Sequence, residues 1–497
     1  NVNPITRLDY PDPDVIRVED TYYMVSTTMH FMPGCEILQS FDLVHWEHVT
    51  YVYETLDHTD AQQLKSGQNI YGQGMWAASL RYHEGRFCIC FVANDTRKTY
   101  LYTSEKIDGP WKKQLIEGFY HDGSLLFDED GRNYIVYGND EIWITELNED
   151  LTAPKKDGLH RLLVSDHKNP ELGYEGSHIQ KINGYYYIFL IHSLRDRWMR
   201  TEACFYSDSL EGEFTGGDVL CDDRGYCGQG VAQGGIVDTP DGKWYAMLFQ
   251  DSGAVGRIPI LLPVTWKDHF PFFGQNGHVP EEIEVHSTRP GYIYQPLVGS
   301  DDFCNGLLPR WQFNHDPDPR YYHLDALQGT YTITTREVCT ELTQAVNTLT
   351  QRMSYPSCAA EVTVDASALK EGDVAGLCAL QSCYAAVGIT KHHGKYEVLM
   401  LDKKEDGILD MTEGTVVESH QMDFRLEADF CNMKDEARCY YRVNKGDWLP
   451  IGTVHKLYFK LDHFTGCRFG LFCYAAEETG GSACFRDFKY YDVDEIS

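Results

Sequence analysis

The sequence lacks any long apolar run. No segment offers the roughly 18 consecutive apolar residues that a membrane-spanning helix needs. The opening residues, Asn1 to Ile5, also lack the basic and apolar regions of a signal peptide. We therefore expect no membrane partner and favour a cytoplasmic location, with secretion left open in case a signal peptide has been removed.

Basic residues are scarce. The chain has 43 Lys and Arg residues against 75 Asp and Glu residues, which gives a formal net charge of −32. Such a charge repels nucleic acid and anionic lipid surfaces. The balance excludes nucleic acid as a partner and favours a neutral, soluble one.

Cysteines are too few for a disulfide scaffold, with 16 in 497 residues. No C-x-x-C pair is accompanied by a second such pair, so a structural zinc site has little support. Cys88 and Cys90 fall on one face of a predicted strand. We predict reduced, buried thiols and no structural metal.

Long amphipathic helical patterns are missing from the first 285 residues, where a different pattern recurs. A small turn followed by an aromatic strand occurs five times, at residues 20–23, 85–87, 131–134, 184–186 and 242–245. A spacing of about 50 residues is typical of a four-stranded propeller blade. A β-sandwich with irregular hairpins remains the alternative.

A chain of 497 residues exceeds what one hydrophobic core usually supports. After Trp266 the repeat gives way to sequence rich in Pro and Gly, at 289–292, and a new block of short alternating strands starts near Asp302. We predict an all-β protein, with a five-bladed β-propeller in residues 1–296 followed by a β-sandwich in residues 297–497.

Three isolated carboxylates stand out in the first half. Asp12, Asp122 and Glu175 each lie among Gly, Pro or aromatic residues rather than among other charges. Hydrolysis of a glycosidic bond needs one carboxylic acid to protonate the leaving oxygen and one carboxylate to activate water. The trio therefore favours a glycosidase. Asp14 rivals Asp12 in the same motif, and a turn-capping role is the alternative for Asp12 and Asp122.

A propeller explains how such distant residues could meet. The inner strand of every blade borders the central channel, so residues near the starts of different blades converge. Like charges brought together favour the protonated form of one of them, which supplies the acid that the reaction needs.

These motifs resemble glycoside hydrolase family 43. The resemblance covers the whole predicted propeller and rests on three segments in order: Asn3-Pro4-Ile5 with Tyr10-Pro11-Asp12-Pro13, His121-Asp122-Gly123-Ser124-Leu125, and Tyr174-Glu175-Gly176-Ser177-His178. It implies a five-bladed propeller that inverts the anomeric centre, in agreement with the five repeats.

The resemblance also implies a role for each carboxylate. Asp12 becomes the general base, Glu175 the general acid, and Asp122 the residue that orients Glu175 and favours its protonated form. Inversion requires a water between base and sugar, so we expect the carboxyl groups of Asp12 and Glu175 to lie roughly 6.5–9.5 Å apart.

Four further positions match substrate-binding residues of the family. Arg257 corresponds to an arginine of the fifth blade that contacts substrate, and Trp76 to an aromatic residue lining the sugar pocket. Met29 stands where the β-xylosidases often carry Phe. Gln233 lies in a stretch where many relatives place a histidine that holds calcium or water. We expect no required cofactor, with calcium left open.

The second block resembles the concanavalin-like sandwich of the family's β-xylosidases, in which a loop of this domain closes over the propeller mouth. The resemblance implies a pocket, and so an exo-glycosidase that releases terminal xylose, arabinose or both from xylo- and arabinoxylo-oligosaccharides. An endo-arabinanase on the same fold and a non-catalytic carbohydrate-binding propeller are the alternatives. Homo-oligomerisation remains open.

Overall fold

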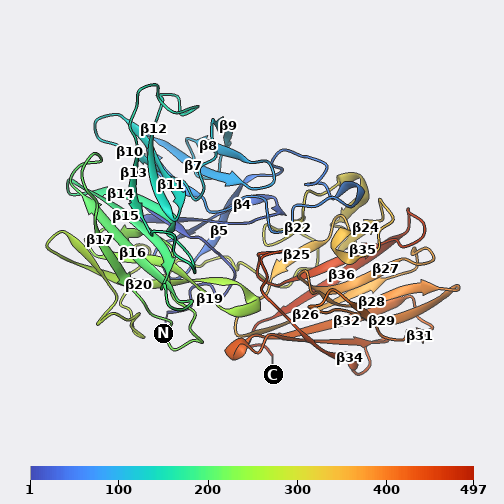
Figure 1. Cartoon of the computed structure of the whole chain (residues 1–497). Helices are drawn as coiled ribbons and strands as arrows, with labels where there is room; N and C mark the ends of the chain where they lie inside the picture. Colours follow the sequence, from blue (N-terminus) through green and yellow to red (C-terminus); the bar gives the residue numbers. More distant parts are fainter. Residues whose placement is uncertain (1, 497) are drawn as a thin grey trace.

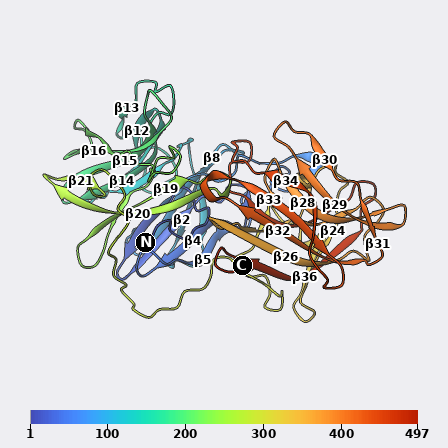
Figure 2. The ribbon, with the colours of Figure 1, turned by 90° about the horizontal axis from the view of Figure 1, so that it is seen from below.

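The computed structural model describes residues 2–496 as two bodies built from β-strands (Figure 1). The first half of the chain, blue to green, forms a ring of sheets, and the last part, orange to red, forms a layered body beside it. Figure 2 shows the same two bodies from below, again side by side. None of the helices within residues 2–496 is both long and apolar enough to cross a membrane.

Five four-stranded antiparallel sheets make up the ring, which confirms the predicted five-bladed propeller. In chain order the blades are β1 (Asp14–Val18), β2 (Thr21–Ser26), β4 (Gly34–Ser40) and β5 (Glu47–Tyr53); β6 (Ser79–His83), β7 (Arg86–Ala93), β8 (Lys98–Ser104) and β9 (Lys112–Ile116); β10 (Ser124–Phe127), β11 (Asn133–Asn139), β12 (Glu141–Leu147) and β13 (His160–Ser165); β14 (Glu175–Ile182), β15 (Tyr185–Ser193), β16 (Arg200–Ser207) and β17 (Thr215–Leu220); β18 (Ile236–Asp238), β19 (Trp244–Asp251), β20 (Arg257–Lys267) and β21 (Phe270–Phe273).

The repeat in the sequence is the hairpin turn between the first and second strands of each blade. Gly85, Gly131, Gly184 and Gly242 occupy this turn in blades two to five, with φ between 78° and 86°. A hairpin turn that matches the strand twist needs a positive φ, which glycine adopts without steric cost. This local requirement is why the blades can be counted from the sequence.

The first strand of each blade meets its neighbours around the centre of the ring. β1 packs against β6 and β18, and β10 packs against β6 and β14. The segments that lead into these strands therefore converge at one end of the ring, although they lie far apart in the sequence.

The second body is a two-sheet β-sandwich, as predicted. One sheet has the order β3 (Phe31–Met32), β22 (Gln312–Asn314), β25 (Leu349–Arg352), β35 (Arg468–Tyr474), β27 (Val374–Leu380), β28 (Ala385–His392), β29 (Lys395–Lys403) and β30 (Leu409–Met411), with β31 (Thr415–Val417) also paired to β29. The other has the order β23 (Tyr322–Asp325), β24 (Thr330–Thr334), β36 (Ser482–Tyr491), β26 (Ser357–Asp365), β32 (Gln421–Asp429), β33 (Glu436–Arg442) and β34 (Leu449–Lys456).

Helix is confined, within the described residues, to five short 3₁₀ turns: η1 (Lys65–Gly67), η2 (Gly253–Val255), η3 (Pro319–Tyr321), η4 (Leu342–Gln344) and η5 (Cys431–Met433). A segment without strands, residues 274–311, links the last blade to the sandwich, and the boundary predicted at 296–297 falls inside it.

The cysteines follow the sequence prediction only in part. All 16 are free thiols, and Cys88 and Cys90 are buried in β7 as predicted. The prediction of burial is wrong for the exposed residues Cys221, Cys227, Cys304 and Cys431. Cys221 and Cys227 lie in the segment that follows β17, outside the strand patterns on which the prediction rested.

The two bodies share structure across their interface. The first blade lends β3 to the edge of the sandwich sheet, where Met32 pairs with Phe313. Ala254 and Val255, just before β20, belong to the hydrophobic core of the sandwich. Glu36 of β4 forms a 3.0 Å ion pair with Arg352 of β25, and both side chains are at most 4% exposed. The interface is therefore packed like the interior of one domain.

Residues 1–296 expressed alone are expected not to fold. Removing the sandwich takes the partner strand from β3, exposes Ala254 and Val255, and leaves Glu36 with His48 as its remaining ionic partner in place of the Arg352 pair. Thermal unfolding followed by near-ultraviolet circular dichroism should show one cooperative transition for the full chain and none for the fragment. A native-like transition in the fragment would contradict this account of the interface.

Candidate active site

Five of the predicted site residues lie just before, or at the start of, the first strand of a blade. Asp12 precedes β1, Trp76 precedes β6, Asp122 precedes β10, Glu175 begins β14, and Gln233 precedes β18. The ring therefore carries all five to the same end of the propeller, one from each blade.

Asp12 is fixed by two hydrogen bonds in a left-handed backbone conformation with φ 53°. Its Oδ2 accepts a 2.6 Å bond from the Thr27 hydroxyl, and its Oδ1 accepts a 3.2 Å bond from Arg257 Nη1. The side chain is buried. Burial raises the pKa of Asp12 above its ordinary value, Arg257 opposes the rise, and the charge of Asp122 adds to it.

Asp14, the rival of Asp12, is fully engaged elsewhere. Its Oδ2 accepts bonds from Arg81 at 3.0 Å and from the Leu80 N–H at 2.7 Å, and its Oδ1 lies 3.1 Å from His178 Nδ1. Burial opposes ionisation, but Arg81 and His178 hold the pKa of Asp14 below its ordinary value. Asp14 ties three blades together, which suits a structural role.

Asp122 and Glu175 meet through a residue that the sequence motifs contained but did not assign. Nε2 of His121 lies 3.0 Å from Glu175 Oε2 and 3.2 Å from Asp122 Oδ2. The backbone N–H of Gly176 donates to Asp122 at 3.0 Å, and the Asn139 amide donates to Glu175 at 2.9 Å. The arrangement fixes the Glu175 carboxyl from two sides.

The charge of this cluster follows from its geometry. Burial lowers the pKa of His121, but the carboxylates of Asp122 and Glu175 outweigh that effect and raise it to about 11. Burial opposes ionisation of Asp122, and His121 holds the pKa of Asp122 below its ordinary value. The two carboxyl groups thus favour the protonated form of the His121 ring, whose Nε2–H can donate to an oxygen of either group.

The same three side chains are, within residues 2–496, the only group of three or more potential metal ligands whose ligand atoms lie within 4.8 Å of one another. Metal binding by histidine needs a neutral ring with a free lone pair. A protonated His121 would have to lose its proton before it could bind a cation, and the absence of a required cofactor stays a prediction.

Aromatic rings line the site on the side facing the sandwich. Trp76 stacks on Phe464 with ring centroids 5.5 Å apart, and its edge meets His121 at 6.0 Å. The guanidinium of Arg257 lies 4.6 Å from the Phe464 centroid. Nε and Nη2 of Arg257 have no hydrogen-bond partner within the described chain. Phe464 belongs to the sandwich, so both bodies build the site.

Met29 and Gln233 are both buried next to segments that carry site residues. Met29 is 2% exposed and is joined by a β-bridge to Met75, the neighbour of Trp76. Gln233 is also buried, and a Cβ on Gly176 would lie 2.7 Å from its Cδ. Its N–H donates to the buried carboxylate of Glu202 at 3.0 Å. Their contact with substrate stays a prediction.

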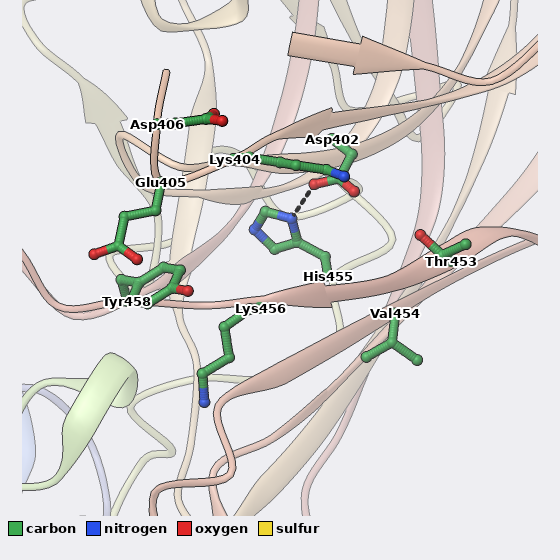
Figure 3. A pocket seen from close by; sticks show the side chains of 9 residues that line it. All are labelled: Asp402, Lys404, Glu405, Asp406, Thr453, Val454, His455, Lys456 and Tyr458. Atoms are coloured by element: carbon green, nitrogen blue, oxygen red, sulfur yellow. Dashed lines mark hydrogen bonds and ion pairs between the residues drawn. The ribbon is translucent and has the colours of Figure 1, made fainter. Parts of the chain in front are cut away.

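A hollow of about 600 Å³ on the sandwich lies apart from this cluster (Figure 3). Figure 3 shows the His455 ring facing Asp402, to which it is hydrogen bonded at 2.6 Å. Its other ring nitrogen bonds to the Cys383 carbonyl at 2.7 Å. None of the carboxylates of the cluster lines this hollow, and its histidine is fully paired.

Replacing Thr27 with Val is expected to move the acid limb of the pH profile upward. The hydroxyl favours the ionised form of Asp12, so its loss raises the pKa of Asp12 further. The role predicted for Asp12, a general base, requires its ionised form, so activity is expected to fall as the pH drops through that pKa. A hydrogen bond to a charged group corresponds to a shift of roughly one pH unit. kcat/KM measured across pH would show it; an unmoved acid limb would mean that Asp12 is not the base.

Convergent carboxylates beside an aromatic wall, at the mouth of a propeller, are typical of a glycoside hydrolase. The sequence profile of the glycosyl hydrolases family 43 matches residues 2–271, and that of the beta xylosidase C-terminal concanavalin A-like domain matches residues 300–491. The chain belongs to glycosyl hydrolase family 43.

Relatives with known names agree with this assignment. The chain is 26% identical to a beta-xylosidase of Formosa agariphila, over 99% of this chain and 89% of that protein. It is 24% identical to a non-reducing end alpha-L-arabinofuranosidase of Bacteroides ovatus, over 82% and 79% of the two chains. A bifunctional GH43-CE protein of Bacteroides eggerthii superposes with a TM-score of 0.93 at 42% identity; this chain is covered completely and spans 64% of that protein.

Proposed function

We propose that the protein is an inverting exo-glycosidase that releases terminal xylose, arabinose or both from xylo- and arabinoxylo-oligosaccharides. The observation that carries the proposal is the placement of two differently held carboxyl groups at one propeller mouth. Asp12 is bound by Thr27 and Arg257, and Glu175 is bound by His121 and Asn139.

Each group takes one proton step. The Glu175 carboxyl gives its proton to the glycosidic oxygen as the bond from that oxygen to the anomeric carbon breaks. A water attacks the anomeric carbon from the opposite face, and Asp12 takes the proton that the water loses. The products are the free sugar with inverted configuration and the shortened oligosaccharide. Asp122 positions Glu175 through Gly176 and His121. The 6.5–9.5 Å separation stays a prediction.

The ring of Phe464 supports terminal cleavage. It stacks on Trp76 and lies over Arg257, whose Nη1 is hydrogen bonded to Asp12. A closed pocket accepts the end of a chain, whereas an internal bond needs an open groove. Xylopyranose and arabinofuranose present a similar spatial arrangement of hydroxyl groups, so one pocket can accept either, and relatives carry both names.

These contacts argue against the two alternative functions, an endo-arabinanase and a non-catalytic sugar-binding protein. An endo-arabinanase needs an open cleft, which the stack of Phe464 on Trp76 obstructs. A non-catalytic sugar-binding propeller draws support only from the departures at Met29 and Gln233. A binding role alone does not account for the hydrogen bonds that hold Asp12 or for the contacts of His121 with Asp122 and Glu175.

Incubation of the purified protein with xylobiose, an arabinose-substituted xylo-oligosaccharide and linear arabinan tests the proposal. Chromatography should show monosaccharide from the first two substrates, and no internal fragments from arabinan. The same rates are expected after treatment with EDTA, because the proposed chemistry uses no cation. Internal arabinan fragments would favour the endo-arabinanase, and no product from any substrate would favour a binding protein. Activity lost to EDTA and restored by calcium would assign a cation to the site.

A further inference from the structure

A loop of the sandwich reaches the propeller mouth between β34 and β35. We define it as the lid loop, residues 457–467. It carries Phe464, whose φ is 58° and whose ring covers Arg257 at 4.6 Å. The position of this loop therefore decides whether the site is a pocket or a groove.

The middle of the lid loop packs on the propeller. The His463 ring stacks on Tyr71 at 4.7 Å and meets His30 edge-on at 5.0 Å. A Cβ on Gly72 would come within 2.7 Å of the Leu461 carbonyl oxygen. Burial lowers the pKa of His463 to about 3, so its ring is neutral in this apolar contact.

The end of the lid loop is held by a carboxylate that no catalytic step uses. Asp9 lies three residues before Asp12 and is 5% exposed. Its Oδ2 accepts a 2.9 Å bond from the Gly466 N–H, and its Oδ1 accepts a 2.8 Å bond from the Arg257 N–H. One side chain thus joins the lid loop to the arginine that holds Asp12.

The backbone around the Asp9 side chain is so close that only glycine fits at two neighbouring positions. Gly256 has φ 113°, and a Cβ there would lie 2.3 Å from Asp9 Oδ1. A Cβ on Gly466 would lie 2.1 Å from the Val255 carbonyl oxygen and 2.9 Å from the Asp9 Cβ. The next residue, Cys467, donates to the Ala254 carbonyl at 2.8 Å. Two glycines thus permit the close approach that the two bonds of Asp9 require.

We propose that Asp9 is a positioning residue that determines specificity, because it fixes the lid loop over the catalytic carboxylates and so confines the site to the terminal sugar. This inference rests on the proposed function. Asp9 acts through Gly466 and Arg257 and touches neither the substrate nor the reacting atoms.

Asp9→Asn tests the positioning role because it replaces only one oxygen of the carboxylate, with an NH2 group. A carboxylate offers acceptors on both oxygens, whereas an amide offers one acceptor and one donor group. Asp9→Asn can therefore keep only one of the two bonds and sets an N–H against an N–H at the other. We expect the lid loop to detach from blade five, so that Phe464 leaves Trp76 and opens the pocket.

The first test compares products from xylohexaose. Wild-type protein should release monosaccharide only, and Asp9→Asn should also release internal fragments. KM for xylobiose should rise at least about tenfold, with kcat changed less, because the loss of a bond to a charged acceptor is of that size. Asp301→Asn is the matched control, since Asp301 is buried in the sandwich and accepts from the Phe303 N–H and the Trp311 indole. It should keep the wild-type pattern.

A double-mutant cycle separates a role in the lid from a general loss of stability. If Asp9 acts through the lid loop, then Asp9→Asn adds little to Phe464→Ala, because both free the same part of the pocket. Asp301→Asn and Phe464→Ala should combine independently. Additive effects of Asp9→Asn and Phe464→Ala on KM would overturn the proposal, and so would terminal cleavage alone by Asp9→Asn.

Hydrogen exchange on the wild-type protein tests the bond between Asp9 and the lid loop without any variant. The Gly466 amide should exchange as slowly as those of the neighbouring strand β35 in the absence of substrate. Free exchange of this amide would overturn the proposal, even if Asp9→Asn fails to fold. A wild-type protein that cleaves no saccharide would refute the proposed function, while the exchange result would still report on the Asp9 contact.

Discussion

Replacing Glu175 with Gln is expected to lower the turnover of xylobiose by about 10³-fold, which is the range for loss of a general acid. The substitution keeps the size of the side chain, so the contacts with His121 and Asn139 have equivalents and the fold should persist. Steady-state kinetics on xylobiose and thermal unfolding measure the two effects separately.

The leaving group gives this variant a diagnostic pattern. An aryl xyloside with a strongly acidic phenol needs no protonation to depart, so Glu175→Gln should cost it far less than it costs xylobiose. Glu171→Gln, an exposed carboxylate of the preceding loop, is the matched control and should behave like wild type. Equal losses on both substrates, or near wild-type activity on xylobiose, would show that the acid is misassigned.

Replacing Asp12 with Asn is expected to abolish most activity on both substrates, by about 10³-fold or more. Every inverting turnover needs a base for the attacking water, whatever the leaving group. The amide cannot take a proton, although it can still accept from Thr27 or Arg257. Kinetics on xylobiose and the aryl xyloside would show losses of similar size.

Asp14 supplies the matched control for Asp12, two residues away in the same motif. Asp14→Asn should weaken the bonds to Arg81 and His178 and lower the melting temperature, while the chemistry remains. A strong loss of turnover in Asp14→Asn together with activity in Asp12→Asn would exchange the two assignments.

The propeller could be predicted because its signals are local. Each blade contains a hairpin turn in which glycine or a short polar segment is followed by an aromatic strand. Such turns depend on neighbouring residues alone. The carboxylates stand at the entries of the first strands, so the blade count also indicated that they would converge. The resemblance to the family supplied their separate roles.

The features that the sequence did not predict, in the site and between the two bodies, depend on contacts between distant segments. Nothing near Phe464 in the sequence shows that it would stack on Trp76, almost 400 residues earlier. Strand β3 has two residues and no pattern of its own, yet it joins the sandwich sheet. His121 stood in a quoted motif, but its bridging role follows only from its distances to Asp122 and Glu175. The pairing of Asp9 with Gly466 spans almost the whole chain.

A proton NMR time course of xylobiose hydrolysis tests the central claim most directly, because it reads the anomeric form of the first xylose released. The account predicts α-xylose before mutarotation, since water held by Asp12 attacks opposite the bond that Glu175 protonates. β-Xylose as the first product would contradict inversion and, with it, the assignment of Asp12 as the base.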